Sequence, residues 1–181
     1  MTTNSGCGVS PLRIVGFLQN AWSPLYAGGT WPRQSWLKAL ERSRSGQRLR
    51  IITEGLKGVA DFWFDNTTPL VGATPDSKLK PDLNHIFSVL DAQHPDYIIG
   101  FGKQAKDSLN KILRPAKTIF VPHPANRTLK NELYEDLVRI LSDGLFDQED
   151  DFLEIMQYHD NAFTYEYGKY VSGQGYVVMS R

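Results

Sequence analysis

The spacing of apolar positions predicts strands that alternate with helices over most of the chain. Short apolar runs bounded by polar, glycine or proline residues are typical of buried strands, and they occur at residues 12–18, 49–53, 60–65, 97–101 and 118–121. Apolar residues three and four positions apart are typical of amphipathic helices, and they occur at about residues 34–44, 83–90, 102–112 and 129–140. This alternation predicts a three-layer α/β/α domain around a central, mainly parallel sheet of four to five strands.

Composition and charge place the chain among globular, non-membrane proteins. It has 181 residues, 41% of them hydrophobic, with 20 basic and 20 acidic side chains. These fractions argue against disorder, collagen and coiled coil. The longest uncharged stretch, residues 14–32, contains two prolines and three glycines, which a membrane span does not tolerate. Residues 1–10 lack the basic start and apolar run of a secretion signal. We therefore expect a cytoplasmic protein with no membrane partner.

The balanced charge divides unevenly along the chain. Residues 1–142 carry 18 basic and 12 acidic side chains, whereas residues 143–181 carry 2 and 8. This predicts a basic body, residues 1–142, followed by an acidic, tyrosine-rich extension, residues 143–181, in which residues 176–179 are strand-like. The basic side chains gather in two groups, Arg33, Lys38, Arg42, Arg44, Arg48 and Arg50, and then Lys103, Lys106, Lys111, Arg114 and Lys117. Such groups either bind a polyanion such as DNA or form solvated helix faces.

Polar residues follow three of the predicted strands, at the point where each strand ends. Gln19 and Asn20 follow the first strand, Asn66 follows the run at 60–65, and His123 follows the run at 118–121. Open parallel sheets bind ligands at the carboxyl ends of their strands. These residues therefore form a candidate site.

The residues around these positions resemble four ordered motifs of the uracil-DNA glycosylase superfamily. The motifs are Gly16-Phe17-Leu18-Gln19-Asn20, Trp63-Phe64-Asp65-Asn66-Thr67-Thr68-Pro69, Pro95-Asp96-Tyr97-Ile98-Ile99-Gly100-Phe101-Gly102 and Val121-Pro122-His123-Pro124-Ala125-Asn126. The resemblance covers about residues 12–142. It implies the glycosylase fold and the hydrolysis of the N-glycosidic bond of a base flipped out of DNA.

The resemblance implies a role for each polar residue. Bond hydrolysis makes an oxocarbenium-like sugar and an anionic base, so the site needs a water on one side and a donor on the other. Asn20 would hold the water, while His123 and the Gln19 backbone N–H would meet the base oxygen. Asn66 would read the pyrimidine edge. The alternatives are turn roles for Asn20 and Asn66 and a structural role for His123.

Aromatic and DNA contacts are also implied. Trp31 is the first choice for the ring that stacks on the flipped base, and Tyr26 is the second. The expected DNA contacts are Pro124, Asn126, Arg127, Lys130 and Arg33. Ala21-Trp22 stands where most relatives have Pro-Gly or Pro-Tyr, and this departure favours a larger or modified pyrimidine.

The single cysteine, Cys7, narrows the branch of the superfamily. It cannot form an intrachain disulfide or supply the four cysteines of an iron–sulfur cluster. We therefore expect neither a metal nor a cofactor. We also expect a monomer, and because no lysine lies within the motifs we expect a reaction without a Schiff base. The setting is either base-excision repair or anti-phage defence, where the base is a glucosylated hydroxymethylcytosine in phage DNA. Two alternatives are a non-catalytic nucleic-acid or nucleotide-binding module and an acidic extension that binds a protein partner.

Overall fold

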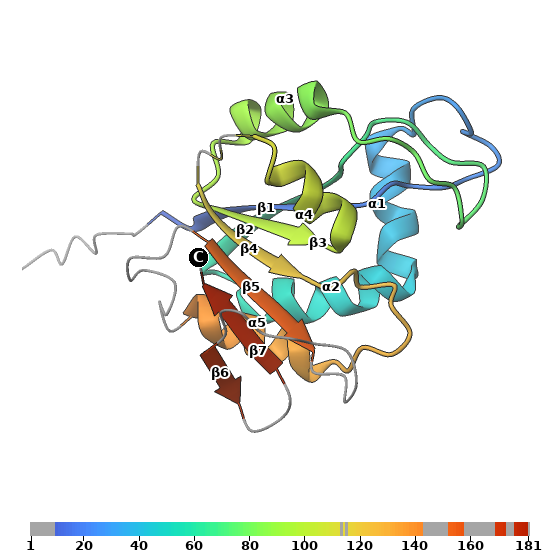
Figure 1. Cartoon of the computed structure of the whole chain (residues 1–181). Coiled ribbons are helices and arrows are strands. Elements are labelled where there is room, and N and C mark those ends of the chain that lie inside the picture. The colour runs from blue at the N-terminus through green and yellow to red at the C-terminus, as the bar shows by residue number, and fades with distance from the viewer. Residues whose placement is uncertain are drawn as a thin grey trace, which may run out of the picture.

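The structure is a computed structural model, and it describes residues 10–112, 114, 116–142, 152–157, 169–172 and 176–180. Figure 1 shows one sheet with helices around it. The strands are β1 (Leu12–Leu18), β2 (Ala60–Asn66), β3 (Tyr97–Phe101), β4 (Lys117–Val121), β5 (Phe152–Gln157), β6 (Lys169–Ser172) and β7 (Tyr176–Ser180). The helices are α1 (Arg33–Arg42), α2 (Arg44–Gly55), α3 (Leu83–Gln93), α4 (Lys103–Leu109) and α5 (Glu132–Ser142).

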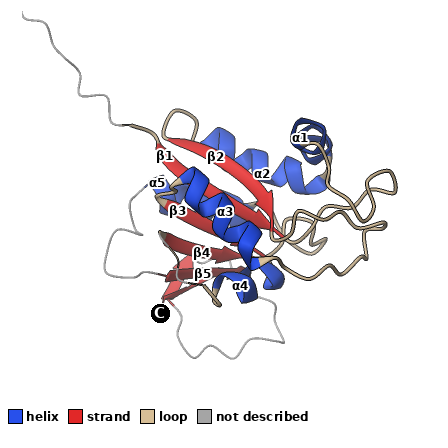
Figure 2. Ribbon diagram, turned by 90° about the horizontal axis from the view of Figure 1, so that it is seen from above, coloured by secondary structure: helices blue, strands red, loops and turns tan. Residues whose placement is uncertain are grey.

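The predicted three-layer α/β/α architecture is confirmed. Alternate residues of the buried strands face opposite sides of the sheet, so the chain builds two cores. Ile14, Ile99 and Ile119 pack on the side of α1, α2 and α5, while Val15, Ile98 and Phe120 pack on the side of α3 and α4. Figure 2 shows α1 and α2 on one side of the sheet and α3 and α4 on the other. None of the helices in the described part of the chain has the length and apolar character that a membrane span requires.

The strand order is β2-β1-β3-β4-β5-β7-β6. The four strands within residues 10–142 are all parallel, and β5 joins β4 in parallel as well. Strands β7 and β6 then add in antiparallel pairing. The sheet therefore has seven strands, and the described parts of residues 143–181 extend its edge rather than forming a further layer. The strand predicted at residues 176–179 is present as β7, whereas the acidic stretch at 143–151 and Cys7 lie outside the described residues.

The expectation of a strand at residues 49–53 was wrong, because these residues belong to α2. Leu49, Ile52 and Leu56 are buried at positions three and four apart, which is the spacing of one helix face. The Ser43 hydroxyl accepts the Gly46 N–H at 3.0 Å and caps the start of the helix. A five-residue segment with three apolar positions cannot by itself distinguish a strand from a buried helix turn. The last helix also begins at Glu132, so Leu129 lies in the preceding loop.

The strand register brings the ends of the central strands to one level. Leu18 pairs with Asn66, and Phe101 pairs with Val121. From β1 the chain turns to α1 and α2 on one face, and from β3 it turns to α4 on the other. In the 2-1-3-4-5 strand order this reversal opens a crevice at the carboxyl ends of β1 and β3, where ligands bind.

Candidate functional site

A cavity of about 600 Å³ opens at this carboxyl edge of the sheet. Its walls come from the loops after β1, β2 and β4 and from α1 and α2. They include five of the residues singled out in the sequence: Gln19, Asn20, Trp31, Asn66 and His123. Among the described residues that line it, none is Asp, Glu, Lys or Arg. The volume is in the range of small-molecule sites, about 300–1,000 Å³, and the lining suits an uncharged ligand.

Asn20 lies two residues after the end of β1, and its side chain holds an unsatisfied acceptor. Its Nδ2 donates to the Ala21 carbonyl at 3.2 Å, while its Oδ1 is buried and has no hydrogen-bond partner among the described residues. An unpaired buried oxygen costs about 1–3 kcal/mol. Because this oxygen is enclosed, a ligand or water donor reaches it only when the side chain turns toward the cavity. Binding such a donor would remove the cost.

Two other residues fix the backbone that leads into Asn20. The Gln19 carbonyl accepts the Thr67 N–H at 3.2 Å, the Thr67 hydroxyl at 2.5 Å and the Gln104 amide at 3.3 Å. Thr67 is fully buried, and Gln104 also donates to its hydroxyl at 2.8 Å. The ends of β1 and β2 are thus joined to α4 at the first residue of the site. The sequence indicated no role for Thr67 or Gln104, since the residues to which they bond are distant in the chain.

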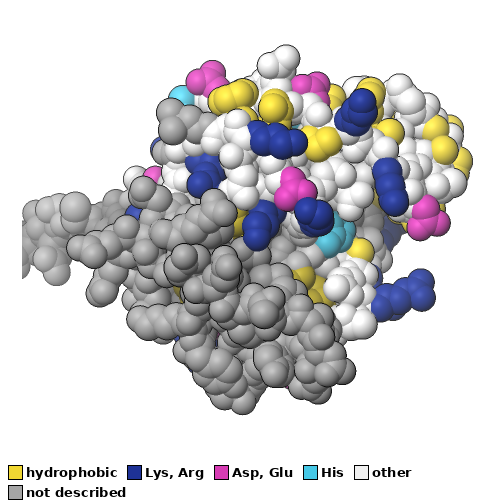
Figure 3. All heavy atoms as spheres, viewed as in Figure 1, with side chains coloured by type: hydrophobic (Ala, Val, Ile, Leu, Met, Phe, Trp, Pro, Cys, Tyr) yellow, Lys and Arg dark blue, Asp and Glu magenta, His cyan; other side chains and the backbone are white. Residues whose placement is uncertain are grey.

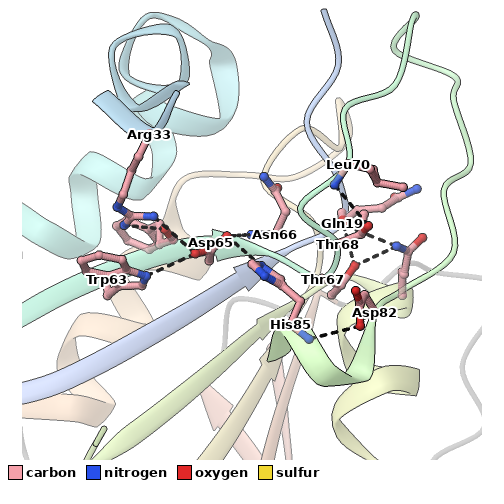
Figure 4. A network of polar contacts seen from close by, with 12 residues as sticks. Gln19, Arg33, Trp63, Asp65, Asn66, Thr67, Thr68, Leu70, Asp82 and His85 are labelled. Carbon is pink, nitrogen blue, oxygen red and sulfur yellow. Dashed lines mark hydrogen bonds and ion pairs between the residues drawn. The ribbon is translucent and has the colours of Figure 1, made fainter. Parts of the chain in front are cut away.

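Asn66 is the last residue of β2 and is 8% exposed. Its backbone N–H donates to the Asp65 carboxylate at 2.8 Å. Figure 4 shows its side-chain amide turned away from Asp65, and this amide makes no hydrogen bond to another described residue. An amide carries both a donor and an acceptor, so Asn66 can pair with the edge of a heterocycle.

His123 follows β4 as an uncharged donor. The Ala125 N–H donates to its Nδ1 at 3.1 Å, which assigns the proton of the neutral ring to Nε2. Burial lowers the pKa of His123 to about 4, so the ring is neutral at pH 7. Such a ring offers an Nε2–H to an oxygen on which negative charge develops.

Gly102 allows His123 to take this position. Its φ of +85° is in the region that favours glycine, and a Cβ there would lie 2.9 Å from the His123 Cβ. The Gly102 N–H also donates to the Val121 carbonyl at 2.7 Å. The glycine at the end of β3 therefore has a role in the site that its place before a helix did not indicate.

The two aromatic candidates lie at different depths. Trp31 lines the cavity, and its ring stacks on Tyr26 with centroids 5.1 Å apart. Tyr26 is not among the residues that line the cavity, so its contact is with the Trp31 ring rather than with the cavity. The Trp31 Nε1 is buried and has no hydrogen-bond partner among the described residues.

Two loops that pair with each other form the rim of the cavity. Four backbone hydrogen bonds of 2.8–2.9 Å join residues 21–29 to residues 71–72. Figure 1 shows the two loops projecting together from the edge of the sheet. They expose Trp22, Leu25 and Leu70 at 47%, 80% and 45%, and Trp22 also lines the cavity. The rim is therefore apolar and held by backbone pairing.

A charged network supports Asn66 from the side of β2 (Figure 4). The Asp65 carboxylate accepts hydrogen bonds from Trp63 and Arg33 at 3.3 Å each and pairs with His85 Nε2 at 3.3 Å. Burial acts to raise the pKa of Asp65, but hydrogen bonds from His85 and from the Asn66 N–H bring it below its usual value. The same bond to Asp65 raises the pKa of His85. His85 thus helps to hold the residue that anchors the Asn66 backbone.

Arg33 lies inside this network, although the sequence predicted a DNA contact. Its guanidinium lies 3.4 Å from the Trp63 ring centre and donates to the Phe64 carbonyl at 2.9 Å. Its side chain is 32% exposed, and burial lowers its pKa although Asp65 opposes this shift. The structure gives Arg33 the role of joining α1 to the end of β2.

The loop after His123 contains the other four predicted DNA contacts. Pro124 is buried, and the Asn126 side chain accepts the Thr128 N–H and hydroxyl at 3.1 and 2.9 Å. Arg127 and Lys130 are exposed. Arg127 and Lys130 are therefore exposed on this loop, whereas Pro124 is buried and the Asn126 amide oxygen is bonded within the loop.

The basic groups predicted from the sequence do not form one continuous patch on the face that Figure 3 shows. Lys and Arg side chains are scattered over the described part of this face, with acidic side chains between them. Lys103 pairs with Asp107 at 2.8 Å, and Arg48 is buried. Part of the basic surplus is therefore used within the fold.

Comparisons with protein-family models, with curated proteins and with solved structures found no match. The geometry of the cavity and the motifs in the sequence are the features of this chain that bear on its function.

Proposed function

We propose that this protein is a monofunctional DNA glycosylase. It would hydrolyse the N-glycosidic bond of a flipped-out modified pyrimidine and leave an abasic site. The base is either uracil-type or bulkier, such as glucosylated hydroxymethylcytosine in phage DNA. One observation carries the proposal: Asn20, Asn66 and His123, from the ends of three separate strands, line one uncharged cavity.

The chemistry assigns a task to each side of the base. As the bond between the sugar C1′ and the base nitrogen breaks, the base takes the electron pair and water adds to C1′; the proton that this water loses passes to solvent, and the anionic base takes up a proton from solvent in turn. The neutral His123 ring meets the base oxygen through its Nε2–H. Asn20 accepts a hydrogen bond from the water but cannot take its proton. This limit favours a slow reaction or a base that leaves readily.

The lining and size of the cavity favour a neutral and bulky base. No lysine or arginine among the described lining residues is placed to pair with a phosphate, so we expect the phosphates outside the cavity, where Arg127 and Lys130 are exposed. A volume of about 600 Å³ corresponds to roughly twenty waters at about 30 Å³ each. This space is large enough for us to expect room for a substituent on the pyrimidine ring.

A second candidate is a module that binds a base or nucleotide without cleaving it. The observation that favours it is the absence of a carboxylate among the described residues that line the cavity, since Asn20 cannot act as a general base. Such a module would bind modified DNA and release no base.

The test uses duplex and single-stranded oligonucleotides that carry uracil, hydroxymethyluracil or glucosylated hydroxymethylcytosine. We expect alkali-labile sites with at least one of these bases, and their loss in Asn20→Ala and His123→Ala. The matched control is Asn84→Ala, an exposed asparagine outside the cavity, which should keep full activity. Tight binding with no alkali-labile site on any substrate would favour the binding module instead.

The monofunctional assignment has its own test. None of the described residues that line the cavity is a lysine, so no Schiff base should form with the sugar. Borohydride added during the reaction should trap no covalent protein–DNA complex. A trapped complex would contradict the assignment.

A further inference from the structure

Arg48 on α2 reaches across to the loop that follows His123. Its Nη1 donates to the Pro124 and Asn126 carbonyls at 2.6 and 2.5 Å, and its Nη2 donates to the Leu129 carbonyl at 2.7 Å. The residue is 9% exposed and forms no ion pair with an acidic residue in the described part of the chain. The rigid fork of a guanidinium can hold several carbonyls at fixed positions, which the single ammonium of lysine cannot do. Arg48 therefore fixes the course of this loop.

The three bonds bear directly on the protonation state of His123. Pro124 and Asn126 are the neighbours of Ala125, and the Ala125 N–H is the donor to His123 Nδ1. Arg48 thus holds the chain on both sides of the peptide that determines which ring nitrogen carries the proton. The Asn126 N–H also donates to the His123 carbonyl at 2.9 Å, which closes the turn.

We propose that Arg48 is a positioning residue that keeps the Ala125 N–H on His123 Nδ1 and so keeps the ring proton on Nε2. Its role is indirect, and it touches neither base nor phosphate. Arg48 therefore departs from both expectations for the basic group that includes it, which were binding to a polyanion such as DNA and a solvated helix face. The consequence for catalysis rests on the proposed glycosylase function, whereas the effect on the ring does not.

The variants are Arg48→Met, which removes the charged fork, and Arg48→Lys, which keeps the charge. The matched control is Arg50→Gln on the same helix. Arg50 is exposed, and its ion pair with Glu54 is long, at 3.9 Å, and also exposed. Circular dichroism and urea unfolding establish that each variant is folded. If Arg48→Met does not fold, Arg48→Lys provides the comparison.

The first measurement is the long-range ¹H–¹⁵N NMR spectrum of the His123 ring in the full chain at pH 7. We expect the Nε2–H form alone in the wild type and in Arg50→Gln, and a mixture of both forms in the Arg48 variants. A folded Arg48 variant with an unchanged ring spectrum would overturn the proposal. This result does not depend on whether the protein cleaves DNA.

The second measurement is the rate of base release on the substrate that the wild type cleaves. We expect kcat to fall at least about tenfold in Arg48→Met, less in Arg48→Lys, and KM for DNA and its salt dependence to stay within twofold. A rise in KM with a shallower salt dependence would assign Arg48 to a phosphate and overturn the proposal. A wild type that cleaves none of the substrates would contradict the glycosylase function, and the ring spectra would still decide the role of Arg48.

Discussion

The lowered pKa of His123 predicts a defined loss of stability at acidic pH. In the folded protein this pKa is about 4, against 6.5 for an ordinary histidine. The unfolded chain therefore takes up a proton at a higher pH than the folded chain does. Above about pH 6.5 both states are neutral at this ring and the group has no effect. As the pH falls from about 6.5 to about 4, the folded state loses stability relative to the unfolded state.

The size of this loss follows from the same shift. One pKa unit corresponds to 1.36 kcal/mol, so a shift from 6.5 to about 4 sets an upper limit of about 3 kcal/mol. The ring borders an open cavity, and solvent there reduces the effect, so we expect about 2 kcal/mol. This is a large part of the free energy of unfolding of a typical domain, about 5–15 kcal/mol.

The assay compares the wild type with His123→Gln, which keeps a polar side chain but cannot ionise. Urea unfolding followed by tryptophan fluorescence gives the free energy of unfolding of each at pH 7 and pH 4.5. Other titrating groups cancel in the difference between the two proteins, because the cavity has no charged residue among its described lining. We expect the wild type to lose about 2 kcal/mol more than the variant. Equal losses in the two proteins would show that folding does not lower the pKa of His123.

His85 provides a comparison of opposite sign. Its bond to Asp65 raises its pKa, so its stabilising effect is present below the unfolded value of 6.5 and is lost as the pH rises through the raised value. His85→Gln should therefore be less stable than the wild type at pH 6 and approach it at pH 9. A difference that stays constant over this range would mean that the pair with Asp65 does not form.

Three further predictions concern single side chains. Asp65→Asn leaves Arg33 and His85 without their carboxylate, so the free energy of unfolding should fall by about 2–4 kcal/mol in urea titrations at pH 7, and an unchanged value would contradict the network. Gly102→Ala should lower it by about 1–3 kcal/mol, since the residue combines a positive φ with a close approach to His123; a neutral effect would show that the loop shifts freely. Arg127→Gln should weaken DNA binding and reduce the slope of log affinity against log salt by about 1, with base release at saturating DNA unchanged; an unaltered slope would remove Arg127 from the interface.

The sequence predicted the sheet well because its strands are buried on both faces. Residues 14–18 and 97–101 carry no charged side chain, are buried throughout and are followed by a polar residue or glycine, and both lie in strands. The run at 49–53 failed because its three apolar residues, Leu49, Ile51 and Ile52, fit a buried helix turn equally well. Length and spacing alone did not distinguish these two cases.

The candidate site was predictable to the extent that strand ends fix positions. Asn20, Asn66 and His123 follow parallel strands, and the strand register brings these positions to one edge. The direction of the arginines was not predictable, because a charge pattern gives the number of cations and not their orientation. Arg33 and Arg48 both turn inward, toward partners that are distant in the chain. The pairing of His85 with Asp65 was missed for the same reason.

In the proposed function, the cavity around Asn20, Asn66 and His123 removes a modified pyrimidine from DNA. The most direct measurement is mass spectrometry of the free bases that the protein releases, in parallel, from uracil-containing DNA and from phage DNA with modified cytosines. We expect release of one class of pyrimidine by the wild type and none by Asn20→Ala or His123→Ala. Release of no base from either DNA by folded wild-type protein, or equal release by the two variants, would contradict this function.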